Sequence, residues 1–185
     1  TNQGPITVSI DVQKVPCATA SFKYLADKHF FDNTSCYRMH NSGYFIVQCG
    51  DPTSSGKGGP TYTYPAENAP AGNRPTYTTG MVAVGVPPDS TVNSSQFFLV
   101  YQNTEDDPNS QSQGAPTSAL PGNFTVLGYI TSGLDVVQKV AAGGLTPATA
   151  SDPNTGKPKI PLTITSLTMT SGAPSAAASA STNPG

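Results

Sequence analysis

Residues 37–52 read YRMHNSGYFIVQCGDP, and this stretch holds the polar and aromatic side chains that indicate a binding site. It places one arginine, Arg38, between two apolar runs, and the second run ends at Gln48. A guanidinium and a glutamine amide beside aromatic side chains supply strong hydrogen-bond donors without an evident nucleophile. Such a combination is better suited to holding a polar backbone group than to cleaving a covalent bond.

Composition places the chain among turn-rich, mainly β globular proteins. Its 185 residues fit one domain; 36% are hydrophobic and 11% are charged. The net charge of -2 gives no basic surface for nucleic acid. No apolar run approaches the roughly 20 residues that span a bilayer, so we expect no membrane segment here. Gly and Pro, at 18 each, indicate many turns between short strands.

Periodicity along the chain predicts strands and two helices. Apolar residues alternate in the strand segments, whereas Ala18, Phe22 and Leu25 follow helical spacing after Pro16. Many strands with two separated helices favour a closed barrel capped by helices. The predicted strands are 6–12, 36–39, 44–48, 80–84, 96–101, 124–130 and 162–169, the last with a bulge at Ser166, and the second helix lies between Gly133 and Gly143.

The ends and loops carry little chemistry. The Gly-rich run 54–60 lacks the Lys-Ser/Thr ending of a phosphate-binding loop and is interpreted as a surface loop. Residues 102–119 form a long acidic loop, and 171–185 form a low-complexity Ala/Ser/Pro tail that we expect to be disordered. We expect one domain over 1–170, and any export signal or anchor outside this sequence.

Several motifs occur in a characteristic order along the chain: FFDNT at 30–34, YR at 37–38, QCGDP at 48–52, NSSQFF at 93–98, VLG at 126–128 and SGLDVV at 132–137. Together they resemble cyclophilin-type peptidyl-prolyl cis-trans isomerases. The similarity covers about residues 5 to 170 and lies in the order and spacing of its motifs. The three cysteines and the insertion at 41–43 are most similar to the exported actinobacterial branch.

The resemblance implies an eight-stranded antiparallel barrel with a helix over each end and a groove on its outer face. It implies that Arg38 catalyses rotation about Xaa-Pro bonds, with no cofactor and no metal. Strand alternation agrees in part, because Ile46 and Gln48 share one face and Gln96 and Phe98 share another. The implied proline pocket is Phe45, Ile46, Phe98 and Leu120; the implied main-chain contacts are Gln48, Gln96, Gly85 and Val86.

The sequence departs from the family pattern near the groove. Ala119 stands where many relatives have Trp, and Phe124, counted with the substrate-binding residues, stands where they have His. Cys36 and Tyr37 replace the family's Phe-His before the arginine. We therefore expect activity with altered peptide preference, and weakened affinity for cyclosporin-type ligands.

The cysteines leave several interpretations open. A cysteine nucleophile with His40 as base lacks the local signatures of such enzymes. A zinc site from Cys17, Cys36, His40 and Cys49 has suitable ligand types, but its spacings match no paired-cysteine pattern. One disulfide and one buried free thiol is the simplest alternative, and the sequence does not say which cysteines pair.

The resulting hypothesis is an exported, monomeric prolyl isomerase that assists the folding of proteins outside the cytoplasm. Its expected partners are proline-containing peptides and unfolded protein segments. Two other classes remain: a binding module of the same fold that recognises proline segments without turnover, and a β-rich structural domain. An assay of turnover on an Xaa-Pro peptide separates the first two.

Overall fold

The computed structural model describes residues 1–69, 77–85, 92–103 and 124–171, and the described chain is mainly β with two helices. The helices are α1 (Pro16–Asp27) and α2 (Leu134–Ala142). The strands are β1 (Thr7–Ile10), β2 (Thr34–Ser35), β3 (Arg38–Ser42), β4 (Tyr44–Cys49), β5 (Tyr64–Pro65), β6 (Met81–Val84), β7 (Val92–Asn93), β8 (Phe97–Gln102), β9 (Val126–Ser132), β10 (Leu145–Thr149), β11 (Asp152–Pro158) and β12 (Thr163–Ile164).

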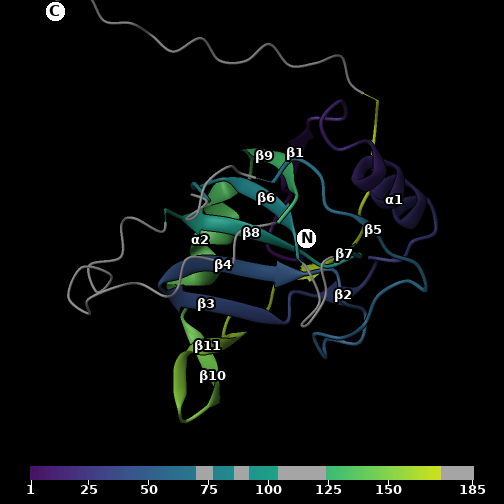
Figure 1. The fold of residues 1–185 in the computed structure, drawn as a ribbon. Helices are drawn as coiled ribbons and strands as arrows, with labels where there is room; N and C mark the ends of the chain where they lie inside the picture. The colour runs from purple at the N-terminus through teal and green to yellow at the C-terminus, as the bar shows by residue number, and fades with distance from the viewer. Residues whose placement is uncertain (70–76, 86–91, 104–123, 172–185) are drawn as a thin grey trace, which may run out of the picture.

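Eight strands form one antiparallel sheet in the order β1-β9-β6-β8-β4-β3-β11-β10. Strands β3 and β4 form a hairpin whose connecting Gly43 has φ +77, a value that glycine adopts without steric penalty. The β10–β11 hairpin lies at the end of the sheet next to β3 and projects from the body of the molecule (Figure 1). This hairpin pairs with β3 at Met39 and His40, directly after Arg38.

One face of the sheet packs with both helices into the main hydrophobic core. Alternate residues of β8, Phe97, Leu99 and Tyr101, belong to this core. Phe98 and Val100 belong to a second cluster on the other face, as the alternation in β8 predicted. Contributions from α1 and α2 to the same core fit the expected barrel capped by two helices.

Both helices begin where their sequence signals predict. Pro16 is at the first position of α1, where its missing N–H leaves no helical bond unmade. The Glu67 carboxylate accepts hydrogen bonds from the N–H groups of Cys17 and Ala18, at 3.0 and 2.9 Å, so a residue distant in sequence caps this helix. Among the described residues, no helix has the length and apolar character needed to cross a membrane.

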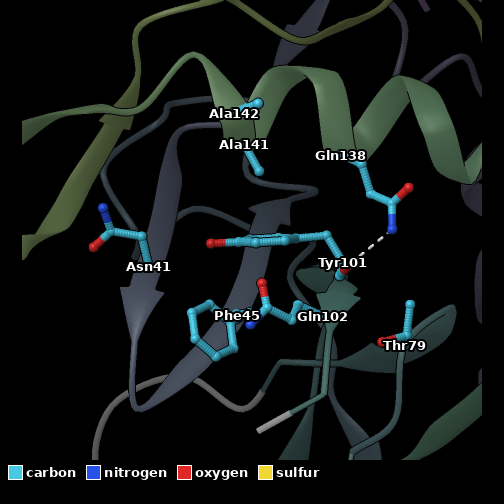
Figure 2. A pocket seen from close by; sticks show the side chains of 8 residues that line it. All are labelled: Asn41, Phe45, Thr79, Tyr101, Gln102, Gln138, Ala141 and Ala142. Carbon is cyan, nitrogen blue, oxygen red and sulfur yellow. Dashed lines mark hydrogen bonds between the residues drawn. The ribbon is translucent and has the colours of Figure 1, made fainter. Parts of the chain in front are cut away.

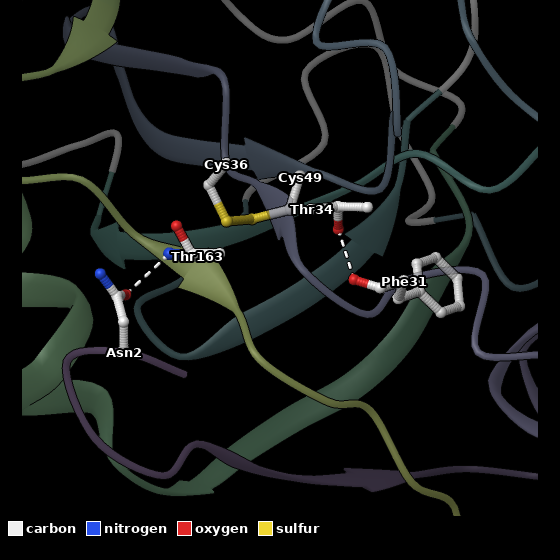
Figure 3. Close-up of a disulfide and its surroundings, with 6 residues drawn as sticks. All are labelled: Asn2, Phe31, Thr34, Cys36, Cys49 and Thr163. Carbon is white, nitrogen blue, oxygen red and sulfur yellow. Dashed lines mark hydrogen bonds between the residues drawn. A yellow bond between two sulfur atoms is a disulfide. The ribbon is translucent and has the colours of Figure 1, made fainter.

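A disulfide joins Cys36 to Cys49 and so links the segments that carry Arg38 and Gln48 (Figure 3). Cys17 is the free cysteine and is exposed, so the expectation of a buried free thiol was wrong. The disulfide also removes Cys36 and Cys49 as thiolate ligands or nucleophiles. No group of His, Cys, Asp and Glu suited to a metal ion occurs in the part of the chain that the structure describes.

Two parts of the predicted strand pattern were wrong. The closing strand expected over 162–169 is reduced to β12, and residues 165–171 form no regular structure. The β10–β11 hairpin was not predicted, because its sequence is rich in Pro and Thr and lacks apolar alternation. The 102–119 loop beyond Asn103 and the tail after Ser171 lie outside the described residues.

Candidate active site

Three neighbouring strands bring Arg38, Gln48 and Phe98 into one row across the sheet. Arg38 pairs with Gln48, Gln48 with Phe98, and Phe98 with Ala83 in the ladder. Residues directly opposite each other in antiparallel strands lie on the same face. The row therefore holds a cation, an amide and an aromatic ring side by side on the face away from the main core.

An apolar cluster lies beside this row. The ring of Phe98 contacts Phe124 edge-on at 5.1 Å and Tyr77 at 5.7 Å between centroids. The Phe124 N–H donates to the Tyr77 hydroxyl at 3.1 Å, which fixes the two rings together. The cluster is buried, with Phe98 2% and Ile46 3% exposed, and its apolar side chains beside polar groups match the composition of a site for an apolar ring flanked by polar main chain. The cluster comprises Ile46, Tyr77, Ala83, Phe98, Val100 and Val126, with Tyr44, Met81 and Phe124 packed against it.

Phe45 lies on the opposite side of the sheet from Ile46. Its ring packs edge-on against Tyr101 at 5.8 Å, within the main core. The expectation that Phe45 and Ile46 line one pocket is therefore not met in this structure. Phe45 instead lines a cavity of about 570 Å³ under α2, which contains neither Arg38 nor Gln48 (Figure 2). The cavity is lined by Asn41, Phe45, Thr79, Tyr101, Gln102, Gln138, Ala141 and Ala142.

Tyr44 is the aromatic residue of β4 on the face of Ile46. It packs against the second cluster and lies against the His40 ring, with 4.3 Å between ring centroids. Simple alternation could have identified Tyr44, because two positions separate it from Ile46. Tyr77 and Ala83 gave no such signal, because they enter the site from other segments.

Gln96 is 2% exposed, and its amide is bonded within the protein. Its Oε1 accepts hydrogen bonds from the Tyr37 hydroxyl at 2.6 Å and from Gln48 Nε2 at 3.0 Å. Its Nε2 donates to the carbonyl oxygens of Gly56 and Gly58, at 3.1 and 3.0 Å. A side-chain contact between Gln96 and a peptide would require one of these bonds to break.

The remaining expected site residues are only partly described. The Gly85 N–H donates to the Gln96 carbonyl at 2.7 Å, so it is used within the protein. A Cβ at Gly85 would lie 3.5 Å from Gln48 Nε2, which places Gly85 at the border of the site. Val86, Ala119 and Leu120 lie outside the described residues.

The loop after β4 is organised around Asp51, which has no exposed surface. Its carboxylate accepts bonds from the N–H groups of Thr53, Gly56 and Gly58, at 2.7, 2.6 and 3.1 Å. Burial raises the pKa of Asp51, but these bonds and that from the Thr53 hydroxyl outweigh it and lower the pKa overall. The carboxylate therefore stays ionised and holds the carbonyls that Gln96 contacts.

Arg38 is exposed and forms no ion pair with a carboxylate among the described residues. Its charge nevertheless affects neighbouring groups. Burial strongly raises the pKa of Tyr37, and nearby Asp51 raises it further. The charge of Arg38 lowers it by a smaller amount. Tyr37 therefore remains a protonated hydrogen-bond donor at neutral pH.

His40 gives a pH-dependent contribution to stability. It is 5% exposed, and its Nδ1 lies 2.9 Å from the Thr155 hydroxyl. Burial, assisted by Arg38 and opposed by Asp152, lowers the His40 pKa from 6.5 to about 4. As pH falls from 6.5 towards 4, the unfolded chain binds a proton that the folded chain excludes, and folding stability decreases.

We expect the free energy of unfolding to fall by about 2 kcal/mol between about pH 7 and about pH 5 because of His40. Urea unfolding at both pH values measures this difference. His40→Asn, which does not titrate, should show a correspondingly smaller pH dependence. The same pH dependence in both proteins would contradict the assignment. Asp51, with its lowered pKa, contributes stability above the ordinary carboxylate pKa and loses it as pH falls from there through its folded-state pKa.

Comparisons with known proteins agree with this geometry. A profile of the family described as cyclophilin type peptidyl-prolyl cis-trans isomerase/CLD matches residues 1–169. The probable peptidyl-prolyl cis-trans isomerase B of Mycobacterium tuberculosis is 36% identical over 180 residues, covering 91% of this chain and 52% of the relative. The isomerase B of Bacillus subtilis is 30% identical over 131 residues, covering 71% of this chain and 79% of the relative. The chain belongs to the cyclophilin-type family.

A solved structure shows the same fold. The cyclophilin-type isomerase of Cryptosporidium parvum, determined in the presence of the dipeptide Ala-Pro, has a TM-score of 0.67 and 21% identity, with 92% of this chain and 96% of that chain covered. This supports the expected mainly β, eight-stranded antiparallel fold with two helices. The chain spans about half the length of the mycobacterial relatives it matches, at 52% and 55%.

Proposed function

We propose that this protein is a peptidyl-prolyl cis-trans isomerase that catalyses rotation about Xaa-Pro bonds. The observation that carries the proposal is the row in which Arg38 pairs with Gln48 and Gln48 with Phe98, beside the apolar cluster. Family membership supports the same reaction. No nucleophile is needed, because rotation breaks no covalent bond.

The chemistry requires a donor that acts on the twisted amide. Rotation about a peptide bond has a barrier of about 18–20 kcal/mol, because conjugation gives the C–N bond double-bond character. Twisting removes conjugation and makes the prolyl nitrogen a better acceptor. A charged donor such as Arg38, aimed at that nitrogen, gains strength in the transition state and lowers the barrier.

The apolar cluster supplies the fixed point of the rotation. In this proposal Ile46 and Phe98 hold the proline ring while the preceding residue turns, and Gln48 contacts the main chain or the guanidinium. Leu120 and Val86 remain proposed members of the site by resemblance. Phe124 contributes an apolar edge in place of the family's histidine, which supports a changed peptide preference and weaker binding of cyclosporin-type ligands.

We also propose that the protein acts as a monomer outside the cytoplasm, on proline-containing segments of unfolded proteins. The Cys36–Cys49 disulfide supports this location, since disulfides persist in oxidising compartments. Fractionation of cells that make the protein tests the location; a reduced protein confined to the cytoplasm would contradict it.

Exchange NMR on a short Xaa-Pro peptide tests the function directly. Uncatalysed exchange takes tens to hundreds of seconds, so catalysis should bring cis–trans exchange into a measurable range at micromolar protein. The same titration reports peptide binding through shifts of resonances near Phe98 and Gln48. Peptide binding without accelerated exchange would contradict the isomerase proposal and identify a binding module. Adding cyclosporin to the assay measures its affinity.

A further inference from the structure

The amide of Gln96 has its hydrogen-bond positions filled on both sides. Its oxygen accepts from two donors, the Tyr37 hydroxyl and Gln48 Nε2. Its nitrogen donates to two carbonyls, those of Gly56 and Gly58. An amide has two donor hydrogens and two acceptor lone pairs, so this is a complete set. The reversed amide would place its oxygen against the two carbonyl oxygens, which only accept, and this fixes the observed orientation.

The fixed Gln96 amide determines how Gln48 is oriented. Because Gln48 Nε2 donates to Gln96 Oε1, the Gln48 oxygen is left on the other side of its amide. Gln48 pairs directly with Arg38 across the β3–β4 ladder. A guanidinium has five donors and no acceptor, so a neighbouring oxygen can orient it and a neighbouring NH₂ cannot.

Resting on the proposed isomerase function, we infer that Tyr37 and Gln96 are positioning residues that orient Gln48 for Arg38. Tyr37 is 8% exposed and shares the Gln96 oxygen with Gln48, so it restrains that oxygen from a second direction. The Asp51 loop holds the two carbonyls that fix the other end of Gln96. Neither side chain needs to touch the substrate to affect catalysis.

The hydrogen bond to Gln96 gives Tyr37, which directly precedes Arg38, a specific role: its hydroxyl restrains the Gln96 amide. Burial keeps Tyr37 protonated, so its hydroxyl can donate throughout the neutral range. Its hydroxyl bond spans 59 residues of sequence and connects the β3 segment to the segment preceding β8. Loss of the hydroxyl should allow Gln96 and Gln48 to adopt more than one arrangement without removing any group from the groove.

The test compares Tyr37→Phe with Tyr64→Phe as a matched control. Tyr64 is also 8% exposed, and its hydroxyl donates to the Ser94 carbonyl at 3.0 Å. We expect Tyr37→Phe to lower kcat about 3- to 10-fold with KM changed less than about twofold, since the oriented donor acts mainly on the twisted state. Tyr64→Phe should leave both constants within about twofold of the wild type.

A spectroscopic measurement separates positioning from a general loss of structure. The side-chain NH₂ signals of Gln48 and Gln96 should show slow hydrogen exchange in the wild type and in Tyr64→Phe. In Tyr37→Phe we expect faster exchange or a second set of signals. Unchanged kcat and unchanged NH₂ signals in Tyr37→Phe, in an active wild-type background, would overturn this inference alone. An inactive wild type that still binds peptide would overturn the proposed function itself.

Discussion

Arg38→Ala is expected to lower kcat/KM about 100- to 1,000-fold, the loss typical of removing one donor that acts on a transition state. The side chain is exposed and pairs with Gln48 in the row beside the apolar cluster. Because it forms no ion pair with the described carboxylates, its removal should change the free energy of unfolding little. Exchange NMR on an Xaa-Pro peptide and urea unfolding measure the two effects separately.

Two variants serve as controls for the Arg38 prediction. Arg38→Lys keeps the charge but loses the planar fork, so it should recover only part of the activity. Lys57→Ala removes an exposed cation from the nearby Asp51 loop and should leave kcat/KM within about twofold. An Arg38→Ala protein that retains a third or more of the wild-type kcat/KM would show that the donor is not Arg38.

Asp51→Ala is expected to destabilise the fold by about 4 kcal/mol, because it leaves several N–H groups without an acceptor. The carboxylate has no exposed surface and accepts bonds from Thr53, Gly56 and Gly58. Thermal and urea unfolding measure the loss. Activity should fall as well, since the carbonyls of Gly56 and Gly58 would no longer be held against Gln96.

Matched variants define what the Asp51 result means. Asp51→Asn keeps one acceptor oxygen, so we expect it to lower the free energy of unfolding by only about half as much as Asp51→Ala does. Asp27→Ala removes an exposed carboxylate that pairs with Lys23 and should change stability by less than about 1 kcal/mol. Equal effects of Asp51→Ala and Asp27→Ala would contradict a structural role for the buried carboxylate.

Periodicity predicted the parts of the structure that local sequence determines. The alternation in β8 placed Phe98 and Val100 opposite Leu99, and the clusters confirm it. Pro16 and the glycines around α2 marked the helix ends because they act on the backbone of their own turn. Ile46 and Gln48 were likewise placed on one face by their spacing.

Two site residues, Phe45 and Gln96, lie differently from what was expected, and the reasons differ. Phe45 directly precedes Ile46, and consecutive residues of a strand face opposite sides of the sheet, so alternation alone places Phe45 in the main core. Gln96 turns inward because a loop more than thirty residues earlier offers two carbonyls. The role of Tyr37 depends on the same meeting of segments, so the sequence around Arg38 did not reveal it.

The position of β10 bears on how the protein avoids association with itself. In the described part of the chain, the sheet ends at this strand, and an open edge of N–H and C=O groups invites pairing with another extended chain. Pro147 interrupts that edge because its nitrogen carries no hydrogen. Under the proposed function, the protein would meet many extended segments of unfolded chains. A proline in this edge strand therefore disfavours the addition of another strand at β10.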